Sequence, residues 1–180
     1  MVQLKGKLEG IIKIPAGDSV LITTSSRHYI DVKFFLLRKL LFKYKKGLYV
    51  SINEPVKSLI EDLINQGIKV ERLSFVDAVA KEKFAFKQKV IFSNIEDLTD
   101  LQIDILDAVA EKPEFLIFDA VTTLLLYHSL NDSGKFIHFL IGKLKEEKIR
   151  SYFLNVDDLP QNKITEFITQ FCDKLVFIQD

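Results

Sequence analysis

The sequence has a single cysteine and no net charge. Cys172 cannot form an internal disulfide, and no cysteine and histidine residues have the spacing of a zinc site, so the fold must be stable without either. The 25 lysines and arginines balance 25 acidic residues, which leaves no overall positive field for nucleic acid or an anionic membrane. We therefore expect no nucleic-acid partner, no resident metal, and a reducing, cytoplasmic location.

Long apolar runs are also missing. No run reaches the roughly 18 residues that a helix needs to cross a bilayer. The N-terminal segment MVQLKGKLEG lacks the apolar core of a signal peptide, so we expect neither a membrane span nor secretion. With 180 residues, of which 48% are hydrophobic, the chain is large enough to bury a sizeable core. We interpret residues 1–180 as one domain.

Short apolar runs alternate with segments of helical period. The runs predict strands at residues 19–24, 48–52, 73–79, 115–118, 152–156 and 175–178. Apolar residues three or four positions apart predict helices at residues 30–46, 56–64, 98–109, 136–144 and 164–171. The stretch from 80 to 94 has no assigned element. Because strands and helices alternate, the predicted fold class is α/β, a three-layer α/β/α arrangement around a mostly parallel sheet.

Polar residues follow the predicted strands. In an open parallel sheet, ligands bind beyond the carboxyl ends of the strands. The residues expected at that edge are 23–28, Asn53, Glu54, Asp77, Asp119, Thr122, Asn155, Asp157 and Asp158. Several carboxylates at one edge could bind a hard cation or act as a general base, so a functional site is expected there.

Five segments occur in a recognisable order: IPAGDSVLIT, GLYVSINEP, LSFVDA, FLIFDAVTTLLL and FCDKLVFI. This ordered set, which covers the chain from about Leu8 to its end, resembles the RecA superfamily, and specifically its archaeal and bacterial KaiC-like branch. The resemblance implies a RecA-like fold of the P-loop NTPase kind. In that family the first segment leads to the nucleotide-binding loop, the second carries a catalytic glutamate, and FLIFDAV is the Walker B strand.

The resemblance also implies an order of strands. The strand at Val20 is expected between those at Val156 and Val176. The strand at Phe118 is expected next to the one at Val156, with the strand at Val50 beyond it. Because crossover connections between parallel strands are right-handed, all of these strands are expected to be parallel.

The expected phosphate loop departs from the Walker A pattern at every key position. That pattern, Gly-x-x-x-x-Gly-Lys-Ser/Thr, falls on the segment from Thr24 to Asp31. Thr24 and Tyr29 replace the glycines, Ile30 replaces the lysine, and Asp31 replaces the hydroxyl residue. Tyr29 places a ring where the backbone must approach phosphate, and Asp31 repels it. We expect this degenerate phosphate loop to hold no nucleotide cofactor.

Two carboxylates match catalytic positions of the family. Asp119 matches the Walker B aspartate that helps to hold Mg²⁺, and Glu54, or Asn53 beside it, matches the catalytic glutamate. Without a phosphate loop we expect structural roles for them, with Asp119 accepting hydrogen bonds from loop N–H groups. The alternative is an atypical site for ATP and Mg²⁺ built from Arg27, Lys33, Asp119 and Glu54. Arg27, His28 and Lys33 are then either anion ligands or solvated surface residues.

Charge is concentrated in two segments. Residues 27–46 carry seven basic residues and one acidic residue, whereas residues 95–114 carry seven acidic residues and one basic residue. Such runs are either two solvated helix faces or two complementary surfaces of a head-to-tail contact.

We expect a non-catalytic KaiC/RecA-like domain that acts as a protein-binding or regulatory module, with a protein partner or a second copy as its partner. The alternative is an ATP-binding RecA-like ATPase in signalling or recombination. The two hypotheses differ in whether Mg-ATP binds.

Overall fold

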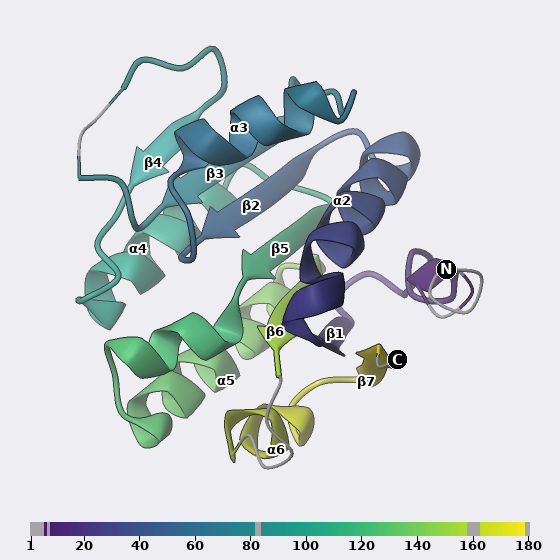
Figure 1. The fold of residues 1–180 in the computed structure, drawn as a ribbon. Helices are drawn as coiled ribbons and strands as arrows, with labels where there is room; N and C mark the ends of the chain where they lie inside the picture. The colour runs from purple at the N-terminus through teal and green to yellow at the C-terminus, as the bar shows by residue number, and fades with distance from the viewer. Residues whose placement is uncertain (1–5, 7, 82–83, 158–162, 179–180) are drawn as a thin grey trace.

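A single sheet of seven parallel strands forms the centre of the molecule (Figure 1). The computed structural model describes residues 6, 8–81, 84–157 and 163–178. The strands are β1 (Ser19–Thr24), β2 (Gly47–Ser51), β3 (Leu73–Asp77), β4 (Val90–Phe92), β5 (Phe115–Asp119), β6 (Arg150–Val156) and β7 (Lys174–Ile178). Their order is β4-β3-β2-β5-β6-β1-β7, which confirms the expected neighbours of β1, β5 and β2.

Helices cover both faces of the sheet, as the fold class predicts. One face packs against α2 (Ser26–Lys43) and α3 (Val56–Asn65). The other packs against α4 (Leu98–Val109), α5 (Leu130–Glu146), α6 (Lys163–Thr169) and the short 3₁₀ helix η1 (Val121–Leu126). The structure is therefore a three-layer α/β/α fold, compatible with a RecA-like architecture. None of the helices in the described part of the chain combines the length and apolar character needed to cross a membrane.

The central strands are buried on both faces. In β5, Phe115 and Ile117 pack on the side of α2 and α3, whereas Leu116 and Phe118 pack on the side of α4 and α5. Successive side chains of a strand point to opposite faces, so a strand covered on both faces must be apolar throughout. This explains why β5 appears in the sequence as a continuous apolar run.

Helix α2 begins one turn earlier than the apolar spacing predicts. Ser25 is its N-cap residue, and the Ser25 carbonyl accepts hydrogen bonds from the N–H groups of His28 and Tyr29, both at 3.1 Å. Ser26 and Arg27, its first two residues, are exposed and polar, so they add nothing to the apolar period that locates a helix in a sequence. The predicted start at residue 30 is therefore wrong.

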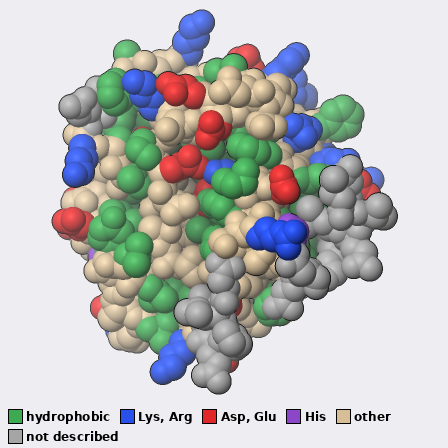
Figure 2. Space-filling view, in the orientation of Figure 1, with side chains coloured by type: hydrophobic (Ala, Val, Ile, Leu, Met, Phe, Trp, Pro, Cys, Tyr) green, Lys and Arg blue, Asp and Glu red, His purple; other side chains and the backbone are tan. Residues whose placement is uncertain are grey.

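Some large apolar side chains lie on the surface. Figure 2 shows hydrophobic side chains between charged residues of both signs on the face in view. The most exposed are Phe42 at 91% and Leu126 at 79%, followed by Ile64 and Ile103. Single exposed apolar residues are ordinary, but a phenylalanine that is almost wholly exposed is a candidate contact residue.

Candidate functional site

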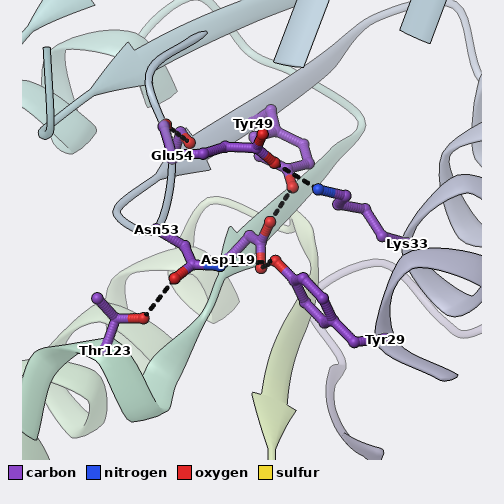
Figure 3. A network of polar contacts seen from close by, with 8 residues as sticks. Tyr29, Lys33, Tyr49, Asn53, Glu54, Asp119 and Thr123 are labelled. Carbon is purple, nitrogen blue, oxygen red and sulfur yellow. Dashed lines mark hydrogen bonds and ion pairs between the residues drawn. The ribbon is translucent and has the colours of Figure 1, made fainter. Parts of the chain in front are cut away.

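A buried polar cluster lies at the carboxyl ends of β2 and β5, against α2 (Figure 3). Asp119, the last residue of β5, is fully buried. The hydroxyl of Tyr29 donates a hydrogen bond to Asp119 Oδ1, and the hydroxyl of Tyr49 donates one to Oδ2. Each carboxylate oxygen thus has a tyrosine partner, which offsets part of the cost of removing this carboxyl from water.

The loop after β2 extends this cluster toward the surface. Asn53 Nδ2 donates to the Tyr29 hydroxyl oxygen at 3.2 Å. Thr123 Oγ1, in η1, donates in turn to Asn53 Oδ1 at 3.2 Å. A chain of hydrogen bonds therefore links η1, the β2 loop, α2 and β5.

An ion pair lies beside the tyrosines. Lys33 is four residues after Tyr29, so both side chains are on the same side of α2 and face the sheet. Its ammonium group donates to Glu54 Oε1 and lies 5.2 Å from the centre of the Tyr29 ring. The Lys33 side chain is only 2% exposed, and that of Glu54 is 22% exposed. This lysine, predicted as a possible anion ligand, already has a counter-ion within the chain.

Burial dominates the proton affinities in the cluster. It raises the pKa of Asp119, although Lys33 and the two tyrosine hydroxyls act in the opposite direction. Burial, together with the charge of Asp119, also raises the pKa values of Tyr29 and Tyr49. Both tyrosines therefore keep their protons and act as hydrogen-bond donors.

The raised pKa of Asp119 predicts a pH-dependent stability. The pKa of this carboxyl is higher in the folded state than its ordinary value of 3.8. The protonated carboxyl therefore contributes fully to the stability of the fold below pH 3.8, and this contribution is lost as the pH rises through the folded-state pKa. We expect wild type to lose stability relative to Asp119→Asn as the pH rises above this ordinary value. Urea unfolding of both proteins at several pH values measures this. A constant difference, or one of opposite slope, would contradict the assigned burial.

The segment from Thr24 to Asp31 does not form a loop, contrary to expectation. Only Ser25 separates β1 from α2. Thr24 and Tyr29 are buried, whereas Ile30 is 48% exposed and Asp31 is exposed. The physical reason is that α2 begins directly after Ser25, whose carbonyl accepts hydrogen bonds from the N–H groups of His28 and Tyr29, so these two groups are engaged within the helix.

Asp77 has the role that was predicted for Asp119. Its carboxylate accepts hydrogen bonds from the N–H groups of Val56 at 2.8 Å, Val79 at 3.1 Å and Ala80 at 2.9 Å. The prediction that Asp119 bonds loop N–H groups is wrong, because two tyrosine hydroxyls occupy its oxygens instead. The carboxylate that satisfies backbone groups at this edge belongs to β3.

The remaining polar residues of the edge form a separate group. Asn155 Nδ2 donates to Thr165 Oγ1 at 2.8 Å and to Thr23 Oγ1 at 3.3 Å, and the Thr165 hydroxyl donates to Asp157 at 3.1 Å. Thr122 Oγ1 accepts from the N–H of Val156. Asp158 lies outside the described residues. Within the described ranges, no three His, Cys, Asp or Glu side chains gather as a metal site would require.

Tyr49 and Thr123 are the members of the cluster that sequence reasoning missed. Tyr49 lies within an apolar strand, where its hydroxyl needs a hydrogen-bond partner once it is buried. A tyrosine within an apolar strand therefore predicts a buried polar partner for its hydroxyl, and this was the signal that could have located the contact of Tyr49. Thr123 gave no comparable signal.

In comparisons with known proteins, no family model and no curated protein matches this chain.

Proposed function

We propose that this chain is a non-catalytic, KaiC/RecA-like domain that works in the cytoplasm as a protein-binding or regulatory module. The observation that carries the proposal is the contact between the Tyr29 hydroxyl and Asp119, beside a strand-to-helix junction of a single residue. By the sequence resemblance, Asp119 is the residue that would help to hold magnesium. Here its two oxygens are bonded to tyrosines.

The first turn of α2 supports the same proposal. A phosphate loop works through several backbone N–H groups that converge on the phosphates and through a lysine that meets their charge. At this junction the N–H groups of His28 and Tyr29 bond the Ser25 carbonyl, and Ile30 stands in place of the lysine. The junction thus lacks that lysine, and two of its backbone N–H groups are already engaged, which supports the proposal.

The alternative of an atypical ATPase requires groups that are already engaged. Lys33 and Glu54 would have to leave their ion pair, and Asp119 would have to leave both tyrosines. Each step would expose a buried charge or hydroxyl without its partner, which costs free energy. This cost favours the non-catalytic proposal.

Mg-ATP is expected to leave the melting temperature unchanged. A ligand present at 100 times its Kd adds about 2.7 kcal/mol of stability, so even weak specific binding becomes visible in a thermal shift. Calorimetric titration with Mg-ATP provides the second measurement. It is made on wild type and on Asp31→Asn, a variant that removes an exposed negative charge. Low-micromolar binding, or ATP turnover that disappears in a well-folded Asp119→Asn variant, would overturn the proposal.

A further inference from the structure

A groove lies beside the end of α2, far from the buried cluster. It has a volume of about 540 Å³, and its walls include Leu41, Phe42 and Ile68 together with Arg38, Lys69 and Arg72. A second hollow of about 540 Å³ continues from it past Ile64. We call the first hollow the Phe42 groove. Figure 2 shows hydrophobic and basic side chains next to one another over this end of α2.

The rim of the Phe42 groove is mainly basic. Arg38, Lys69 and Arg72 line it against one acid, Glu71. The Arg38 side chain donates to the Gln66 carbonyl at 3.1 Å, which holds it at the rim. No carboxylate in the described part of the chain pairs with Lys69 or Arg72. An apolar wall with an unpaired basic rim fits a partner that presents an apolar residue surrounded by acids.

Helix α4 presents such a surface. Asp100, Ile103 and Asp107 follow one another at intervals of three and four residues, so they form one outward stripe, with Asp104 next to it. Ile103 is 51% exposed. None of these three aspartates has an ion pair with any residue that the structure describes. The stripe is therefore complementary to the Phe42 groove: its apolar residue suits the apolar wall, and its negative charges are opposite to those of the basic rim.

Other parts of the two charged segments already meet within the chain. Glu111 pairs with Lys89 at 3.2 Å and with Lys46 at 3.4 Å, and these contacts lower the pKa of its carboxyl. Glu114 accepts a hydrogen bond from the N–H of Lys45 at 2.6 Å. These residues are satisfied internally, whereas Lys69, Arg72 and the aspartates of the α4 stripe have no ion pair with any residue that the structure describes.

The two surfaces cannot meet within one molecule. Helix α2 covers one face of the sheet and α4 covers the other (Figure 1). We propose that the α4 stripe of one copy docks in the Phe42 groove of the next, in a head-to-tail contact. Because the two surfaces differ, each added copy leaves both kinds of surface available, and the assembly grows into a ring or filament. The inference rests on the proposed function only in that the chain acts through a protein contact.

Two one-sided variants test this contact. Phe42→Ser removes the aromatic anchor of the groove, and Asp100→Lys with Asp107→Lys reverses the charge of the stripe. In sedimentation velocity at low ionic strength, wild type is expected to grow beyond a dimer with concentration, and each variant to associate about 30-fold more weakly. An equal mixture of the two variants should form a one-to-one dimer and stop there, because each copy keeps one intact surface. Glu166→Lys, an exposed charge change on α6, should associate as wild type does.

The mixture decides the outcome. A wild type that stays monomeric, variants that still associate, or a mixture that does not form a dimer would each overturn the proposed contact. All of these substitutions are on the surface, so unfolding curves close to that of wild type exclude misfolding as the cause. If wild type is monomeric and does not bind Mg-ATP, the proposed contact is wrong and the proposed function stands. If wild type assembles and binds Mg-ATP tightly, the contact stands and the proposed function is wrong.

Discussion

Replacing Asp119 with alanine is expected to lower the free energy of unfolding by about 3–5 kcal/mol. The hydroxyls of Tyr29 and Tyr49 both donate to this carboxylate, and both would lose their acceptor while they remain buried. Each buried polar group without a partner costs about 1–3 kcal/mol, and the missing side chain also leaves a cavity. Since a domain is stable by only about 5–15 kcal/mol, such a loss is large. Urea unfolding at neutral pH measures it.

Asp119→Asn is the matched control for this prediction. The amide has the shape of the carboxyl, and it can accept a hydrogen bond from one tyrosine while it donates to the oxygen of the other. At neutral pH we expect Asp119→Asn to be at least as stable as wild type and clearly more stable than Asp119→Ala, because it keeps hydrogen-bonding groups beside the tyrosines and carries no buried charge. An Asp119→Ala variant as stable as wild type would show that neither tyrosine depends on this carboxylate.

Removing the partner of Lys33 is expected to have the second largest effect. Glu54→Ala should lower the free energy of unfolding by about 2–4 kcal/mol, because it leaves a buried ammonium group without its counter-ion. The double variant Lys33→Met, Glu54→Ala removes both charges and should recover most of this loss, and Lys33→Met alone completes the cycle. A double-mutant cycle built on chemical denaturation measures the coupling between the two residues.

The prediction is contradicted if the losses in free energy of unfolding caused by Lys33→Met alone and by Glu54→Ala alone simply add up in the double variant. An exposed pair supplies the comparison: Lys112 and Glu147 also interact, but their side chains are 69% and 39% exposed. Water screens such a pair, so Glu147→Ala should leave stability nearly unchanged. A loss for Glu147→Ala as large as that for Glu54→Ala would mean that burial is not what makes the Lys33 pair important.

Most of the fold could be predicted because buried parallel strands leave a clear signal. β1 spans the predicted residues 19–24, and β5 covers the predicted residues 115–118 and ends one residue later, on Asp119. The order of strands came from the resemblance of ordered segments and not from periodicity. β4 left only a short apolar piece, residues 90–92, which was not assigned as a strand; these three residues lie at the edge of the sheet and are only partly buried. A short, half-covered strand needs no long apolar run.

The site was predictable in position but not in its contacts. Asp119 and Glu54 lie at the expected edge of the sheet, where strand ends must gather. Tyr29 contacts Asp119 and Lys33 contacts Glu54. The direction of both side chains depends on where α2 begins. The exposed residues Ser26 and Arg27 concealed that start, so the rotation of the helix, and with it the direction of these two side chains, could not be read from apolar spacing.

The place of β1 in the sheet determines when the protein can complete its fold during synthesis. Val20 pairs with Tyr152 of β6 and with Lys174 of β7, so both neighbours of this early strand come from the last part of the chain. The β2 and β3 strands can pair soon after they leave the ribosome. The apolar segment SVLITT must wait on the order of ten seconds at about 5–20 residues per second. A nascent chain that stalls before β6 therefore presents this segment without either of its strand partners.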